Sequence, residues 1–377
     1  MSTTEEMIGR EDINDIEAIL GIANTDVDEV QHAVKDNADA LFTWDYTLAR
    51  PALRKLYEKA KVGQWNATTD LPWHIEVDQE KQVAQQQALI GVGLDTSYYK
   101  GTPVENWGDK EWLTFGVESN NWMLSQFMHG EQGALLCTAK ICETVPWYDA
   151  KLYAATQVVD EARHVEVFAR YLDEKLSGHY PINAHLRMLL DDIINDSRWD
   201  MTYLGMQIMV EGLALAAFGF QHQLTTDPLL KKLLRYVMSD EARHVAFGVL
   251  SLKEVYEHMT DAEMRERQEF AFEAAVRMRD RFLQQEVWER LGVNPKDVVP
   301  LVLNDPTRPQ FQALLFSKIV PNCKKLGLLD RNDAWLRRRF EEMNVIQFED
   351  WADTSEEFTS FGLDEEMPDP LAQAHSA

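Results

Sequence analysis

The feature that most constrains this chain is a five-residue string, Asp-Glu-Ala-Arg-His, that occurs at 160–164 and again at 240–244. The two copies are 80 residues apart. A further Glu stands 30 residues before the Glu of each copy, which pairs Glu131 with Glu161 and Glu211 with Glu241. A repeat of this kind indicates a chain built from two similar halves.

A helix breaker lies near the middle of each 30-residue interval, at Pro146 in the first and at 226–228 in the second. Each half is therefore predicted to form two helices folded back on each other. Because both helices rise about 1.5 Å per residue, the upstream Glu returns to the level of the motif Glu. Glu and His within a motif are three residues apart and share one helix face. Two such hairpins, packed as a four-helix bundle, bring together Glu131, Glu161, His164, Glu211, Glu241 and His244.

This set of side chains predicts a site for two metal ions. Four carboxylates inside an apolar bundle would repel one another and lose their hydration unless cations or partners compensated them. Apolar residues flank Glu211 on both sides, so it is not expected at the surface. Two helices with one Glu each and two with Glu-x-x-His form the ligand set of di-iron and di-manganese bundles. Carboxylate and imidazole ligands suit iron or manganese. A purely structural charge cluster is the alternative, and it requires six positions to coincide by chance.

With these residues, the chain resembles the ferritin-like di-iron carboxylate superfamily. Its two motifs resemble those of the hydroxylase α-subunits of bacterial multicomponent monooxygenases. The likeness covers about 110–260, and a weaker one, through 60–67 and 70–73, reaches back to about residue 40. It implies two iron ions, or manganese in their place, held by the six residues above. A metal-bound imidazole also needs an acceptor for its other N–H. The resemblance assigns that support to Asp160, Arg163, Asp240 and Arg243, for which solvated Asp–Arg pairs are the alternative.

Three positions beside the motifs narrow the expected reaction. Phe168 stands where radical-generating ribonucleotide reductase subunits have a Tyr, and Val237 stands where arylamine N-oxygenases have a third His. The two differences argue against both of these activities. Leu215 stands where many monooxygenases have a Thr. We expect a non-haem di-iron oxygenase or oxidase that uses O2 to hydroxylate, desaturate or similarly oxidise a small, hydrophobic organic substrate. A ferroxidase or iron-handling ferritin-like protein stays open, as does a Mn/Fe or di-Mn oxidase with the same ligands.

Residues one or two helical turns from the ligands are expected to line a substrate pocket. Core packing explains most of them equally well. They are Phe127, Leu135, Thr138, Gln157, Phe168, Gln207, Leu215 and Phe218. No catalytic residue is expected beyond the metal ligands. Electrons are expected from a separate ferredoxin- or flavin-type donor, and the resemblance implies a homodimer.

Charge and composition exclude several other classes of protein. The net charge is −26, and the acids concentrate at the two ends of the chain. No basic surface for nucleic acid is expected, and no membrane span. The acidic N-terminus is neither a secretory signal nor a transit peptide, so a cytoplasmic protein is expected. The three cysteines, Cys137, Cys142 and Cys323, are expected to be reduced and buried.

The predicted fold is all-α: a ferritin-like four-helix bundle with additional N- and C-terminal helices. The predicted domains are an acidic segment (1–29), the helical metal-binding domain (30–291), a helical extension (292–343) and an acidic tail (344–377). Helices are expected over about 30–62, 79–92, 110–142, 150–176, 185–195, 200–224, 229–259, 261–291, 300–303, 310–326 and 331–343.

Overall fold

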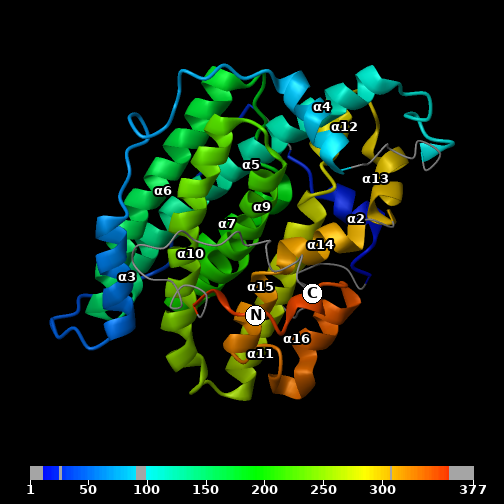
Figure 1. The fold of residues 1–377 in the computed structure, drawn as a ribbon. Coiled ribbons are helices and arrows are strands. Elements are labelled where there is room, and N and C mark those ends of the chain that lie inside the picture. The colour runs from blue at the N-terminus through cyan, green and yellow to red at the C-terminus, as the bar shows by residue number, and fades with distance from the viewer. Residues whose placement is uncertain (1–11, 25–27, 91–98, 306–307, 356–377) are drawn as a thin grey trace.

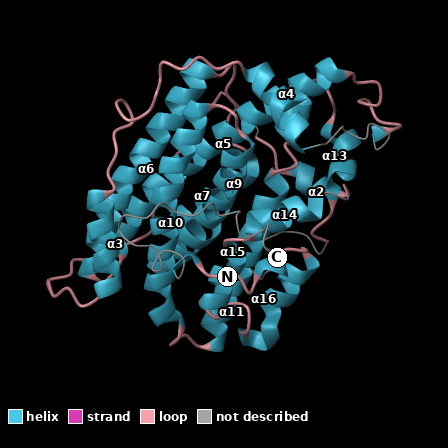
Figure 2. Ribbon diagram, in the orientation of Figure 1, coloured by secondary structure: helices cyan, strands magenta, loops and turns pink. Residues whose placement is uncertain are grey.

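The computed structural model describes residues 12–24, 28–90, 99–305 and 308–355. Every regular element within these ranges is a helix, which confirms the predicted all-α class (Figures 1 and 2). Residues 1–11 and 356–377, which hold much of the two acidic ends, lie outside the described residues. The elements are α2 (Ile16–Gly21), α3 (Pro51–Val62), α4 (Gln79–Ile90), α5 (Asp109–Thr144), α6 (Tyr148–Lys175), α7 (Ala184–Asn195), α8 (Trp199–Tyr203), η2 (Leu204–Val210), α9 (Glu211–Leu224), α10 (Pro228–Tyr256), α11 (Asp261–Arg281), α12 (Gln285–Arg290), α13 (Pro295–Leu303), α14 (Arg308–Phe316), α15 (Ile319–Lys325), α16 (Arg331–Glu342) and η3 (Ile346–Phe348).

The four helices that carry the six predicted ligands form two antiparallel hairpins, α5 with α6 and α9 with α10. The first turn contains Pro146, as the sequence predicts. At the second turn, the Asp227 carboxylate accepts a hydrogen bond from the backbone N–H of Leu229 at 2.9 Å. Pro228 takes the first position of α10, where no intrahelical N–H bond is needed. Because α6 and α10 also contact each other, the hairpins join into the predicted four-helix bundle with helices added at both ends.

The segment 28–50 forms no helix, although the sequence pattern predicted one from about residue 30 to 62. Only α3, at the end of that range, is helical. Asp36 and Asp45 each accept a hydrogen bond from the backbone N–H two residues further on, at 3.0 and 2.9 Å. Such local bonds compete with helix formation. The prediction was therefore wrong for 28–50. The helix α3 packs against α6 and α10 (Figure 1).

The stretch predicted as one helix over about 200–224 is divided into three parts. Between α8 and α9 lies η2, a seven-residue π-helix that ends where Glu211 begins α9. π-helical turns are rare, and they concentrate at functional sites. Gly248 of α10 lies against η2, and a Cβ added there would stand 2.6 Å from the Cβ of Gln207. The absence of a side chain at Gly248 therefore allows this close approach of α10 to η2.

Substituting Gly248 with Ala is expected to lower the free energy of unfolding by about 1–3 kcal/mol, because the added methyl group overpacks against Gln207. Urea-induced unfolding of the metal-free protein measures the change. Gly130→Ala is the matched control, since nothing lies within 4 Å of the Cβ that Gly130 would gain on α5. That change should instead stabilise the helix by about 0.5–1 kcal/mol. Equal effects of the two substitutions would contradict the close packing of η2 on α10.

One helical stretch, Trp199–Leu224, is long and apolar enough to cross a membrane. In this protein 89% of its most apolar window is buried inside the fold. Leu204, Ile208 and Leu213 along it have no exposed surface and belong to the main hydrophobic core. Packing inside the bundle therefore accounts for its apolar composition.

Candidate metal centre

The six predicted ligands come together from four elements in the middle of the bundle. Glu131 comes from α5, Glu211 is the first residue of α9, and each motif contributes a Glu and a His, from α6 and α10. All six residues are buried, none exposing more than 5% of its surface. The hairpin geometry predicted from the 30-residue spacing therefore places them in one cluster.

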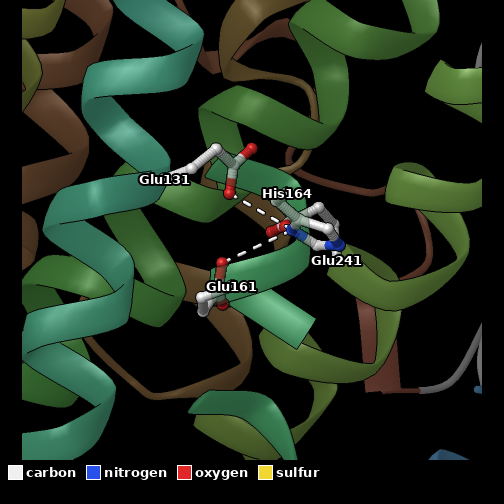
Figure 3. A group of neighbouring side chains, drawn as sticks. All are labelled: Glu131, Glu161, His164 and Glu241. Atoms are coloured by element: carbon white, nitrogen blue, oxygen red, sulfur yellow. Dashed lines mark hydrogen bonds and ion pairs between the residues drawn. The ribbon is translucent and has the colours of Figure 1, made fainter. Parts of the chain in front are cut away.

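The first ligand group surrounds His164 (Figure 3). Its Nδ1 atom lies 3.2 Å from Glu131 Oε2, 3.4 Å from Glu161 Oε2 and 3.1 Å from Glu241 Oε1. One ligand atom from each of these four residues lies within 4.8 Å of the others. Three carboxylates and one imidazole nitrogen thus face a common point.

The second ligand group adjoins the first and consists of Glu161, Glu211 and His244. The Nδ1 atom of His244 lies 3.0 Å from Glu161 Oε1 and 3.6 Å from Glu241 Oε1. Glu161 belongs to both groups, and Glu241 approaches the histidines of both. The two motif glutamates therefore lie between the two ligand groups and could contribute an oxygen to either of them.

Several carboxylate oxygens of the cluster lack a donor. Glu161 Oε2, Glu211 Oε2 and both oxygens of Glu241 accept no hydrogen bond of good geometry within the described part of the chain. Buried carboxylate oxygens normally have a partner, and an exception needs a physical explanation. Carboxylate oxygens and imidazole nitrogens gathered in this way are ligands for two hard or borderline divalent cations, so the residues present suit iron or manganese.

The pKa shifts within the cluster also fit a site for cations. Burial, together with neighbouring carboxylates, raises the pKa of Glu131 and of Glu211 well above the ordinary range. The nearby histidines lower the pKa of Glu161 against the effect of burial. Burial alone would lower the pKa of both imidazoles, but the neighbouring carboxylates raise it. Glu131 has the largest effect of these on His164, and Glu161 has the largest on His244. The cluster thus balances its charge with protons, which metal ions would displace on binding.

The two motifs support each other's histidines in a crossed arrangement. The Nε2 atom of His164 lies 3.1 Å from Oδ2 of Asp240, in the other motif. The Nε2 atom of His244 lies 3.3 Å from Oδ2 of Asp160. Each Asp is therefore positioned to accept the Nε2 proton, which leaves Nδ1 of each imidazole facing the carboxylates.

The two motif arginines connect these aspartates. Arg163 donates to Asp160 Oδ1 at 2.5 Å and to Asp240 Oδ2 at 3.1 Å. Arg243 pairs with Asp240 and donates to Asp160 Oδ2 at 3.3 Å. The side chains are almost fully buried, so these are not the solvated pairs considered as the alternative.

Two residues just after α3 complete this network, and the sequence did not assign them a role. Gln64 donates to Asp160 Oδ1 at 3.0 Å and accepts from Arg163 at 2.8 Å. The indole N–H of Trp65 donates to Asp240 Oδ2 at 2.8 Å. Both lie within 60–67, where the chain resembles di-iron oxygenases. That resemblance was the sequence signal that could have pointed to them. Their partners could not be read from sequence because α3 is about 100 residues from the first motif.

The eight predicted pocket residues include an aromatic group of three and a polar group of three. Phe127, Phe168 and Phe218 contact one another, with ring centroids 4.6–6.0 Å apart. Thr138, Gln157 and Gln207 are polar and fully buried. Leu215 is also buried, whereas Leu135 is only partly buried. A separate open cleft of about 810 Å³, between α7, α8 and α11, is lined by none of the eight.

No family model matches the sequence, and no curated protein matches it. Solved structures of R2-like ligand-binding oxidases show partial similarity. One is a mutant with an anaerobically reconstituted Mn/Fe cofactor, at a TM-score of 0.46 and 18% identity over 72% of this chain and 92% of that one. Another, with an aerobically reconstituted metal cofactor after photoconversion, has a TM-score of 0.42 and 17% identity over 80% and 93%. At TM-scores below 0.5 this similarity carries no argument about function, and the metal centre is inferred from its side chains.

Proposed function

We propose that this protein is a non-haem di-iron enzyme that activates O2 and oxidises a small organic substrate with a hydrophobic body. The observation that supports it most strongly is the pair of adjoining ligand groups that share Glu161, buried within the bundle. Two iron ions bound there would supply the electrons and the Lewis acidity for reaction with O2. Manganese in one or both positions is compatible with the same ligands.

The side chains of this chain have three roles in the proposal. The four glutamates and two histidines hold the ions, and their charge is matched to two divalent cations. Asp160 and Asp240 hold the Nε2 protons of the opposite histidines, which keeps each Nδ1 lone pair available. The phenylalanine cluster of Phe127, Phe168 and Phe218 closes one end of the centre and excludes water from it.

Other components are needed for turnover. Insertion of one oxygen atom of O2 into a substrate consumes two electrons beyond those that the substrate supplies. We propose that a separate ferredoxin- or flavin-type protein delivers them, and that the protein works as a cytoplasmic homodimer.

The test is to load the metal-free protein with Fe(II), or with Fe(II) and Mn(II), and to count the metals bound per chain. The loaded protein is then reduced without oxygen and mixed with O2 in the presence of candidate organic substrates. We expect two metals per chain, O2 consumption, and a product that contains oxygen from O2 or a new double bond. Fewer than one metal per folded chain would contradict the metal centre. Accumulation of hundreds of irons per particle without substrate oxidation would instead indicate an iron-handling protein.

A further inference from the structure

A second sequence repeat ends at two of the metal ligands, and its spacing differs from that of the first repeat. Tyr153, Gln157 and Glu161 follow one another at intervals of four residues along α6. Tyr203, Gln207 and Glu211 repeat the same order 50 residues later, through α8, η2 and α9. Positions four apart lie on one face of a helix. Each Glu ligand of these two helices is thus preceded on its own face by a Gln and a Tyr.

The two series converge inside the bundle. The Nε2 atom of Gln157 donates to Glu161 Oε1 and to Glu211 Oε1, both at 2.9 Å, and so connects the ends of the two series. The ring of Phe247 lies between the two tyrosines, with centroids 4.3 Å from Tyr153 and 5.0 Å from Tyr203. Three layers follow one another from the metal ligands outwards: a glutamate layer (Glu161 and Glu211), a glutamine layer (Gln157 and Gln207) and an aromatic layer (Tyr153, Phe247 and Tyr203).

The polar atoms of these layers are buried without enough partners. Gln157 and Gln207 have no exposed surface. The carbonyl oxygen of Gln157 and both amide atoms of Gln207 have no hydrogen-bond partner among the described residues. Buried amides in folded proteins are normally paired, so three unpaired amide atoms beside one centre indicate a ligand that pairs with them.

The backbone around Gln207 is also specialised. Gln207 is the middle residue of the π-helix η2, and Gly248 lets α10 pack directly on its Cβ. A rare helical form and a close glycine contact therefore fix the position of Gln207, four residues before the ligand Glu211.

We propose that the glutamine layer, Gln157 with Gln207, binds a primary carboxamide group of the substrate and that Gln207 selects it. This rests on the proposed function and adds the chemical class of the substrate. A primary carboxamide offers two N–H donors and one carbonyl acceptor. The layer offers the complement, the two carbonyl oxygens of Gln157 and Gln207 and the Nε2 donor of Gln207.

An uncharged group also suits the electrostatics. Two divalent cations cancel the four carboxylates of the centre, so the loaded site has no net charge with which to hold an anion or a cation. Both tyrosines of the aromatic layer stay protonated, because burial raises their pKa. The aromatic layer then supplies apolar contacts for the rest of the substrate.

The test uses three ring compounds of similar size, benzamide, toluene and benzoate, with the iron-loaded protein kept free of oxygen. Isothermal titration calorimetry measures each dissociation constant, and metal content is measured on the same samples. We expect benzamide to bind at least about tenfold more tightly than toluene or benzoate, because unpaired buried polar groups penalise the ligand that cannot pair with them. In Gln207→Leu the preference for benzamide over toluene should fall below about threefold, with two metals per chain retained.

Gln221→Leu is the matched control. Gln221 is another buried glutamine of α9, but it bonds to Asn120 at 2.9 Å and is ten residues from Glu211. It should keep the full preference for benzamide. The inference is overturned if wild-type protein with two metals binds toluene as well as benzamide, binds neither, or keeps the preference in Gln207→Leu. Wild-type protein that binds no metal would refute the proposed function instead.

Discussion

Replacing Glu161 with Gln is expected to remove the pair of metal ions from the protein. Glu161 is the residue shared by both ligand groups, and its two oxygens face different histidines, His164 and His244. The amide is the same size but carries no charge and has only one oxygen. Loss of supporting residues outside the ligand set already lowers metal affinity by about 10–100-fold. We therefore expect a loss of at least about 100-fold at both positions.

Metal content by mass spectrometry and chelator competition measure this loss. Glu166→Gln is the control, since Glu166 is exposed on the same helix, α6. It should retain two metals per chain. If Glu161→Gln lost only one of the two ions, Glu161 would serve a single position, and the shared arrangement would be wrong.

Replacing Arg243 with Leu is expected to cause the largest loss of stability among these changes. The Arg243 side chain is 5% exposed, and its guanidinium pairs with Asp240 and Asp160, the two carboxylates that face the histidines. Removing one partner of a buried ion pair leaves an uncompensated buried charge, which typically costs about 3–5 kcal/mol. The free energy of unfolding of the metal-free protein should fall by this amount, as measured in urea.

Arg170→Leu provides the comparison. Arg170 pairs with Glu174 at 2.7 Å on the same bundle, where the two side chains are 30% and 43% exposed, and its guanidinium also lies over the ring of Trp73. An exposed ion pair and an exposed cation–π contact each contribute about 1 kcal/mol or less, so this substitution should cost less than the loss of Arg243. Similar losses from both substitutions would show that the crossed Asp–Arg network is no more important than a surface ion pair.

The all-α fold and the clustering of the six candidate ligands could be predicted from the sequence because both depend on local rules. An interval of 30 residues with a breaker in its middle places two glutamates at one level, whatever the rest of the chain does. The three-residue spacing of Glu and His places them on one face. The helix prediction failed at 28–50, which contains no Gly or Pro to exclude a helix, and where Asp36 and Asp45 accept hydrogen bonds from nearby backbone N–H groups that compete with helix formation.

Contacts between distant segments were beyond the reach of these rules. The pairing of His164 with Asp240 and of His244 with Asp160 joins two motifs that are 80 residues apart. Gln64 and Trp65 reach the same aspartates only because α3 packs across α6 and α10. The π-helix η2 lies in a largely apolar run, where hydrophobic periodicity cannot separate one helical form from another.

The sequence by itself determined which residue types meet and at what height in the bundle, because helical rise and side-chain direction follow from local geometry. Only the tertiary structure decided which partner each of them has, because hydrogen bonds between helices depend on how the hairpins pack. Gln157 and Gln207 show the difference most clearly. Both are polar residues on inner faces in the sequence, but only packing shows that one links two ligands and that the other has no hydrogen-bond partner among the described residues.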